Sequence, residues 1–155
     1  MRITVNLSDL ESMMSRTAEQ LRAGLAAAVE EVAEQTKTAA LNNLKGDARG
    51  KHLMSSIQTE VQAQGDRAVG QVGCGAATGI DGEAGESFGI YVHEGTGIYS
   101  RTGMGRKDVP WFYMDAEGKG HLTSGMEANP FLENAYNEIA PQAAGIMAAK
   151  LMGGR

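Results

Sequence analysis

The sequence has almost no cysteine and no long apolar run, and each shortage excludes a class of protein. Its one cysteine, Cys74, cannot form an internal disulfide, which points to a reducing compartment. No apolar run approaches the roughly 20 residues that a membrane-spanning helix needs. The first residues, MRITVNLSD, lack the apolar core of a signal peptide. We therefore expect a protein that is made and folded in the cytoplasm and has no membrane partner.

Positive charge is also in short supply. Lysine and arginine number 14 against 19 aspartate and glutamate residues, so the formal net charge is −5 and the pI is about 5.2. A protein that grips nucleic acid through a broad basic surface has the opposite balance. The composition argues against that function, but it allows a surface past which nucleic acid merely slides.

Aromatic residues are scarce, at 5%, whereas glycine is abundant, with 21 residues. The length of 155 residues and a hydrophobic fraction of 42% are typical of one soluble globular domain, residues 1–155, with a buried core. Most glycines lie between Gly65 and Gly125, and they predict turns and hairpins there. Two long exposed loops are expected, at about 76–86 and 95–110.

The N-terminal third predicts a strand followed by a long helix. Residues 2–7 alternate between polar and apolar, as a half-buried strand does. From residue 10 to residue 44, apolar residues recur every three or four positions, which indicates one amphipathic helix. Gly24 is a point at which this helix could divide, and a polar loop with two glycines, residues 45–51, ends it.

The middle of the chain predicts antiparallel strands. Residues 57–64 alternate, Gly65 and Asp66 form a turn, and residues 67–75 return as the partner strand. Residues 87–94, SFGIYVHE, are expected to form another strand. A second hairpin is expected within residues 111–123.

A second helix closes the chain. Pro130 suits its first position because a missing N–H costs nothing there, and Asn129 is expected to cap it. Pro141 is expected to kink or split it. The order of the elements indicates an α+β fold, in which a long N-terminal helix and a C-terminal helix pack on one face of an antiparallel β-sheet.

His93 and Glu94 are the first residues to consider for chemistry. The pair is similar to the start of a zinc-protease motif, but that motif is helical and has a second histidine four residues after the first. This chain has Gly97 there, and the expected spacing of zinc ligands is absent. The alternative is a solvated or paired histidine and glutamate at the end of a strand. We expect no metal and no cofactor.

The remaining candidates for catalysis are weak. The glycines from 95 to 105 lack the Gly-Lys-Ser/Thr signature of a phosphate loop, and a mobile loop is the alternative. Ser55, Ser56 and Cys74 have no nucleophile elbow and no spacing that ties them to a base. We therefore predict that the protein is not an enzyme and has no catalytic residue.

Trp111, Phe112 and Tyr113 form the densest aromatic cluster. One interpretation is that alternate residues pack in the core while Phe112 faces outward. The other is an interface anchor, because aromatic residues and arginine are enriched where proteins meet. A basic loop just before the cluster supports the second interpretation. Its cations are Arg101, Arg106 and Lys107.

Three short motifs occur in a fixed order along the chain. The first, L-x-x-S-I before the first hairpin, is formed by Leu53, Ser56 and Ile57. The second, an aromatic residue, an acid and GT, is formed by Tyr91, Glu94, Gly95 and Thr96. The third, P-F-L-x-x-A at the start of the last helix, is formed by Pro130, Phe131, Leu132 and Ala135. Over roughly residues 21–140 the chain thereby resembles the tail-completion (head–tail joining, minor tail) family of long-tailed bacteriophages and their prophages.

The resemblance implies a structural virion protein with no catalytic role. Such a protein forms a ring, expected to be a homo-hexamer, in the neck of the particle. Its expected partners are head-side connector or stopper proteins and tail-tube or terminator proteins. Double-stranded DNA passes through the lumen only as a non-specific passenger, and an acidic ring lets it pass because like charges repel. The expected location is the virion.

The resemblance also suggests how the copies meet. The bend at Gly95 and Gly97 is expected to send residues 98–109 out toward a neighbouring subunit. The expected interface residues are Gly95, Thr96, Gly97, Arg101, Arg106, Lys107, Trp111 and Tyr113. Two alternatives stay open: a protein-binding module or regulator encoded by a mobile element, without catalytic activity, and a small hydrolase.

Overall fold

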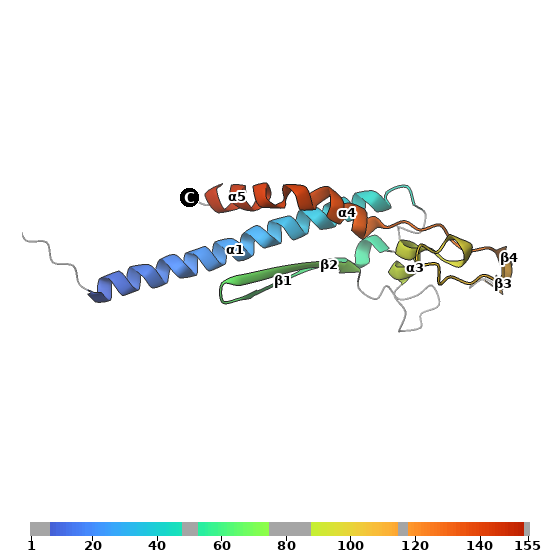
Figure 1. Cartoon of the computed structure of the whole chain (residues 1–155), viewed down its shortest axis with the longest axis horizontal. Helices are drawn as coiled ribbons and strands as arrows, with labels where there is room; N and C mark the ends of the chain where they lie inside the picture. The colour runs from blue at the N-terminus through green and yellow to red at the C-terminus, as the bar shows by residue number, and fades with distance from the viewer. Residues whose placement is uncertain (1–6, 48–52, 75–87, 115–117, 154–155) are drawn as a thin grey trace, which may run out of the picture.

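The computed structural model describes residues 7–47, 53–74, 88–114 and 118–153. Figure 1 shows an elongated molecule built on one long helix, α1 (Leu7–Leu44). The predicted helix is confirmed, but it continues through Gly24 without a break. A Cβ at Gly24 would come within 3.0 Å of Leu151 Cδ2 on the last helix, so this glycine permits close helix packing. The strand predicted for residues 2–7 lies outside the described residues, except for Leu7, which belongs to α1.

The first predicted hairpin is confirmed and lies along α1. A short 3-10 turn leads into β1 (Ile57–Gln64), which pairs antiparallel with β2 (Arg67–Cys74). The pairing is continuous and has no bulge, and Gly65, with a φ of 64°, makes the turn. A Cβ at Gly70 would lie 3.0 Å from Val29 Cγ1. The absence of a side chain there lets the hairpin pack flat against α1.

The strand predicted for residues 87–94 is not found in the described residues 88–94. Instead, a short helix, α3, spans Phe88–Glu94. It ends at Gly95, which has a φ of 73° and whose N–H donates to the Tyr91 carbonyl at 2.9 Å. Val92 is fully buried in the core. The periodicity of such a short apolar run does not distinguish a helix from a strand. The burial of Val92 in the core favours the helix.

The second predicted hairpin is confirmed. A 3-10 turn at Gly97–Tyr99 precedes it, and β3 (Trp111–Met114) pairs antiparallel with β4 (Gly120–Thr123). The two hairpins do not pair with each other. In the described part of the chain, two separate two-stranded sheets therefore replace a single continuous one.

Pro141 splits the closing helix, as predicted. Helix α4 (Phe131–Ile139) is followed by a 3-10 turn at Ala140–Gln142 and by α5 (Ala143–Gly153). Proline removes an N–H donor and clashes with the preceding turn, so the α-helical bonding is interrupted at this point.

The predicted cap of this helix is wrong. Pro130 directly precedes α4, and no side chain caps the helix. The Asn129 side-chain amide instead donates to the Asn43 carbonyl at 3.3 Å and to Asp47 Oδ2 at 3.1 Å. Asn129 thus ties the start of α4 to the end of α1, a contact between segments that are far apart in the sequence.

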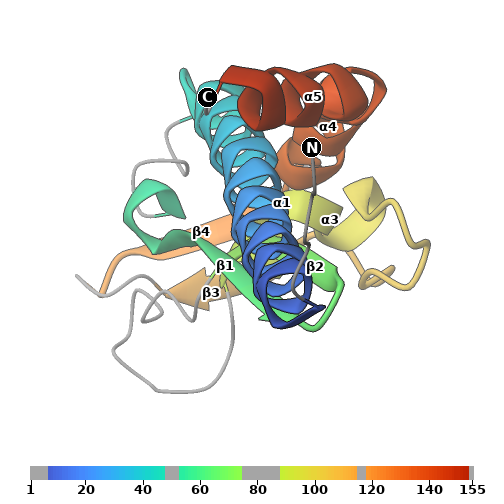
Figure 2. The same ribbon diagram turned by 90° about the vertical axis from the view of Figure 1, so that its left-hand side faces the viewer.

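Helix α1 is the middle layer of the body. Figure 2 looks along it and shows α4 and α5 on one side and the β1–β2 hairpin on the other. The core gathers residues of α1, α3 and α4, and its largest fully buried side chains are Phe131, Leu44, Leu53 and Val92. The predicted α+β class is confirmed. None of the helices in the described ranges has both the length and the apolar character needed to cross a membrane.

Most residues of the first and third motifs build this core. The buried members are Leu53, Ile57, Phe131 and Ala135. Leu132 packs against the same cluster, and Ser56 Oγ donates to the Leu53 carbonyl at 2.8 Å. These two motifs are therefore requirements of the fold. The second motif, with Tyr91 and Glu94, lies at the end of α3, where the candidates for function gather.

Candidate functional site

The bend in YVHEGTG is held by residues that follow the second hairpin. The Thr96 N–H donates to the Met126 carbonyl at 2.8 Å, and the Met126 N–H donates to Thr96 Oγ1 at 2.9 Å. The Ile98 N–H donates to the Ser124 carbonyl at 3.1 Å. Segments 30 residues apart are thereby joined, and they form a base from which the β3–β4 hairpin extends.

Three glycines make this close approach possible. Gly95, Gly97 and Gly125 have φ values of 73°, 60° and 121°, a region that side chains disfavour. A Cβ at Gly97 would lie 2.1 Å from the Ser124 carbonyl oxygen, and one at Gly125 would lie 2.1 Å from the Thr96 carbonyl oxygen. Neither position has room for a side chain. The bend predicted at Gly95 and Gly97 is confirmed, but it follows a helix, α3, and not the strand that was expected there.

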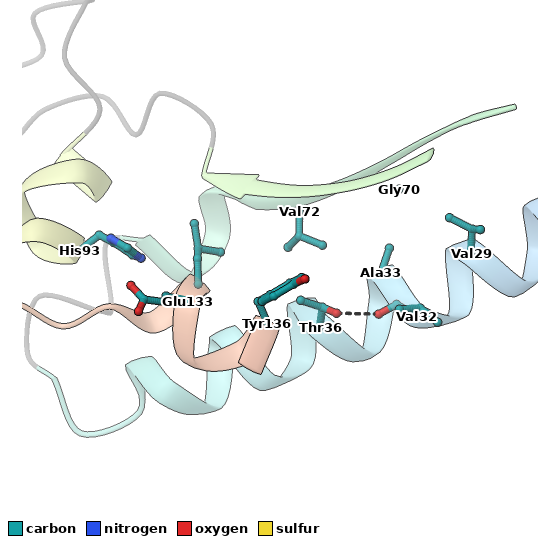
Figure 3. A pocket seen from close by; sticks show the side chains of 10 residues that line it. Val29, Val32, Ala33, Thr36, Gly70, Val72, His93, Glu133 and Tyr136 are labelled. Atoms are coloured by element: carbon teal, nitrogen blue, oxygen red, sulfur yellow. Dashed lines mark hydrogen bonds between the residues drawn. The ribbon is translucent and has the colours of Figure 1, made fainter. Parts of the chain in front are cut away.

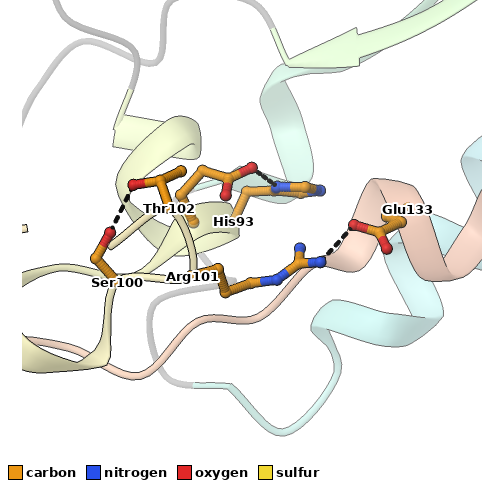
Figure 4. Close-up of polar contacts among 6 residues, drawn as sticks. His93, Ser100, Arg101, Thr102 and Glu133 are labelled. Atoms are coloured by element: carbon orange, nitrogen blue, oxygen red, sulfur yellow. Dashed lines mark hydrogen bonds and ion pairs between the residues drawn. The ribbon is translucent and has the colours of Figure 1, made fainter. Parts of the chain in front are cut away.

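The loop after the bend does not extend outward as predicted. The Arg101 N–H donates to the Glu94 carbonyl at 2.9 Å, and the Arg101 guanidinium donates to Glu133 Oε2 on α4 at 2.7 Å (Figure 4). A Cβ at Gly105 would lie 2.1 Å from the Gly97 carbonyl oxygen. These hydrogen bonds, the ion pair and the close approach hold the loop against its own chain. The expectation that residues 98–109 extend outward as a cationic arm is therefore wrong.

The cations of the loop are mostly paired within the chain. Arg106 donates to both carboxylate oxygens of Asp108, at 2.8 and 2.7 Å, and its guanidinium carbon lies 5.4 Å from the centroid of the Trp111 ring. The hydrogen bond from Arg106 lowers the pKa of Asp108, and the same bond raises the pKa of Arg106. Of the three predicted interface cations, Lys107 alone has no ion pair with a described residue.

A hollow of about 470 Å³ opens beside the bend. Its lining includes five of the predicted interface residues, namely Gly95, Thr96, Gly97, Arg106 and Trp111. Ile90, Tyr91 and Met104 supply much of its apolar wall. The remaining predicted interface residues do not line it. They are Arg101, Lys107 and Tyr113.

The aromatic cluster follows neither interpretation completely. Phe112 faces outward, as the core interpretation predicts, and its exposed fraction is 63%. Trp111 is half-buried beside Arg106. Tyr113 is exposed and stacks on His121, with ring centroids 5.1 Å apart, so its predicted place in the core is wrong.

This end of the molecule exposes many large apolar side chains. Among the described residues, the exposed set between positions 90 and 122 comprises Ile90, Tyr91, Ile98, Tyr99, Met104, Phe112, Tyr113, Met114 and Leu122. We call this set the apolar end. Phe112 and Leu122 are direct cross-strand partners, so one face of the hairpin is apolar and uncovered. Contiguous exposed apolar and aromatic residues mark interaction sites. Sequence reasoning missed Met104 and Leu122 because only their exposure separates them from core residues.

His93 and Glu94 form a hydrogen-bonded pair beside the core. His93 Nδ1 lies 2.9 Å from Glu94 Oε1, and the His93 and Phe131 rings meet in a T-shaped arrangement with centroids 5.6 Å apart. Within the ranges that the structure describes, no three His, Cys, Asp or Glu side chains gather as metal ligands do. The expected paired histidine and glutamate are confirmed, at the end of a helix in place of a strand.

Cys74 and Ser56 lack the surroundings of a nucleophile. Burial raises the pKa of the Cys74 thiol, and a hydrogen bond with Ser56 lowers it to a smaller extent. A reactive thiol needs a lowered pKa. The Ser56 hydroxyl donates to the Leu53 carbonyl, so it helps to shape the turn before β1.

A second hollow, of about 570 Å³, lies between α1, β2 and α4 (Figure 3). We call it the α1–β2–α4 groove. Its apolar lining is Val29, Val32, Ala33, Val72 and Leu132. Figure 3 shows His93 and Glu133 toward one end of the groove and Tyr136 near its middle, beside Thr36. Of its lining residues, the sequence analysis singled out only Leu132 and His93, and it did not bring them together because the lining comes from distant segments.

No model of a protein family matches the chain, and neither does any curated protein or solved structure. The resemblance to phage tail-completion proteins therefore depends on the three short motifs. The apolar end offers apolar contact surface on a rigid base, which suits binding to another macromolecule.

Proposed function

We propose that the protein is a structural subunit in the neck of a long-tailed phage or prophage particle. Several copies, expected to be six, form a ring that completes the tail. The ring joins the tail tube or its terminator to the connector or stopper on the head side. The alternative of a binding module or regulator encoded by a mobile element uses the same apolar end, and the experiment below separates the two.

The observation that carries the proposal is the position of the second motif, beside the hollow at the base of the β3–β4 hairpin. Glu94, Gly95 and Thr96 line the hollow beside the bend, and Thr96 bonds to Met126 to hold the base of the β3–β4 hairpin. One of the three motifs that carry the resemblance therefore supports the surface that is best suited to meet another protein.

The apolar end supports an assembled state. Met104, Phe112 and Leu122 are 86%, 63% and 72% exposed. Burying one such side chain contributes about 1.5–3 kcal/mol, so covering several of them stabilises an assembly substantially. Interfaces are also enriched in aromatic residues and methionine, which this end supplies in Tyr91 and Met114 as well.

The charge of the chain supports a passive relation to DNA. The formal net charge is −5, and a ring of such chains repels the phosphate backbone. DNA then moves through the lumen without being held. A specific DNA-binding protein carries a cluster of unpaired cations, whereas Arg101 and Arg106 are each paired with a carboxylate here.

Electron microscopy of particles made without this protein tests the proposal. The expected result is filled heads and separate tails that fail to join, with joining restored when the protein is supplied again. Intact infectious particles in its absence would contradict the proposal and favour the binding module or regulator.

A further inference from the structure

The α1–β2–α4 groove lies at an edge of β2 that no other described strand covers. Strand β2 pairs only with β1 among the described residues, and the groove is lined by Gly70 and Val72 of β2 but by no residue of β1. Natural edge strands are usually protected by charges, prolines or bulges. Strand β2 has no bulge, and it has no charged residue or proline after Arg67. An open edge beside an apolar groove suits the addition of one more strand.

We propose that the added strand is the N-terminal segment, residues 2–6 (RITVN), of a second copy of this chain. In an extended strand, Ile3 and Val5 share one face and the polar residues share the other. Paired with β2, this segment turns Ile3 and Val5 toward α1 and α4. The groove, about 570 Å³ and mostly apolar, accepts these two branched side chains while the polar face meets solvent.

The segment lies too close to the start of α1 to reach the groove of its own chain. Helix α1 passes Gly70 at Val29, and at about 1.5 Å per residue Leu7 lies roughly 33 Å farther along. The hairpin tip at Gly65 lies only roughly 16 Å from Gly70. The helix therefore projects roughly 17 Å beyond the tip. Figure 1 shows that α1 extends past the end of the β1–β2 hairpin. Residues 2–6 can lie at most about 20 Å from Leu7, which is too short a reach for them to pass the tip and run along β2 of their own chain.

A contact of this kind propagates from copy to copy. The donated segment and the accepting groove are different surfaces, so each copy can donate to one neighbour and accept from another. Such heterologous contacts close into a ring when the rotation permits. The inference rests on the proposed ring and adds to it by naming the two surfaces that meet between subunits.

Paired substitutions in the segment test the contact. Ile3→Asp with Val5→Asp places two carboxylates in the groove, and we expect the native mass to fall to that of a single chain, 16.3 kDa, in analytical ultracentrifugation. Thr4→Asp with Asn6→Asp adds the same charge to the solvent face and should leave the assembly intact. Circular dichroism verifies that both variants are folded. An unchanged assembly in the first variant, or a wild type that is a single chain at every concentration, overturns the inference.

Disulfide cross-linking tests whether the N-terminal segment lies in the groove of a neighbouring copy. In a Cys74→Ser background, Ile3→Cys combined with Tyr136→Cys should give a ladder of covalently linked copies, because Tyr136 lines the groove and is 65% exposed. A link within one chain would place the segment in its own groove. Dimers from Ile3→Cys alone would mean that two segments meet each other. Either result, or no link at all, contradicts the proposal.

These outcomes separate the inference from the proposed function. If the protein forms a ring in the phage neck but Ile3→Asp with Val5→Asp leaves the ring intact, only the inference fails. If the copies link through the groove but particles form normally without the protein, only the proposed function fails.

Discussion

Gly97 and Gly125 lie face to face where two distant loops cross, and neither has room for a side chain. A Cβ on Gly97 would lie 2.8 Å from the Cα of Gly125, and a Cβ on Gly125 would lie 2.8 Å from the Cα of Gly97. This crossing fixes the base of the β3–β4 hairpin. The apolar end is therefore held in place by backbone contacts in addition to side-chain packing.

Replacing one of these glycines should loosen the crossing. Gly97→Ala adds a left-handed backbone penalty of about 1–2 kcal/mol and an overlap that costs roughly 1–3 kcal/mol more. Gly103→Ala is the matched control, because Gly103 has a φ of 69° but nothing within 4 Å of a Cβ. Urea unfolding measures both variants. Equal losses of unfolding free energy would show that the crossing is not tight.

Phe131→Ala should destabilise the core strongly. Phe131 is fully buried among Leu44, Leu53 and Val92, and truncating a buried phenylalanine typically costs about 3–5 kcal/mol. Tyr136→Ala on the same helix is the control, since Tyr136 is 65% exposed and its removal should have little effect on folding. A melting temperature that Phe131→Ala leaves unchanged would remove Phe131 from the core.

Phe112→Ser with Leu122→Ser should impair assembly without harming the fold. Both side chains are exposed on one face of the β3–β4 hairpin, so we expect an unchanged melting temperature but a marked loss of head–tail joining in a complementation assay. Met152→Ser, which alters a side chain that is 71% exposed on α5, should support joining normally. Normal joining by the hairpin variant would show that the apolar end is not an interface.

Cys74 should react more slowly in the folded protein than in the unfolded chain at alkaline pH. Burial raises the pKa of the thiol above its ordinary value of 9.0, so the folded state favours the neutral thiol. The resulting stability is present below the ordinary pKa and is lost as pH rises through the raised pKa. At pH 9.0 we expect iodoacetamide to modify the native protein more slowly than the urea-unfolded chain. Equal rates would contradict the burial of Cys74.

The elements with strong local signals could be predicted from the sequence. The apolar stripe of α1 repeats through about ten turns of helix, so a single residue that departs from the pattern does not change the prediction. The first hairpin combines alternation with a turn at Gly65. Pro141 interrupts the last helix because it has no N–H to donate. In each case the deciding physics lies within a few residues of the chain.

The errors occurred where distant contacts decide the outcome. The short run around Val92 fits a helix or a strand, and burial against Phe131 favours the helix. Asn129 has a capping residue's chemistry, but Asp47, 82 residues away, receives its hydrogen bond. The loop after Gly97 looked free in the sequence because the carboxylate that holds Arg101 belongs to Glu133 on α4. The bend itself was predicted from its glycines, whereas the apolar end required the exposed fractions of its side chains.

Electron cryomicroscopy of the neck in isolated particles tests the central claim most directly. We predict a closed ring of copies of this chain around the DNA, with Phe112 and Leu122 of each copy buried against an adjacent molecule. A complete neck in which no density accommodates helix α1 and its hairpin would contradict the account.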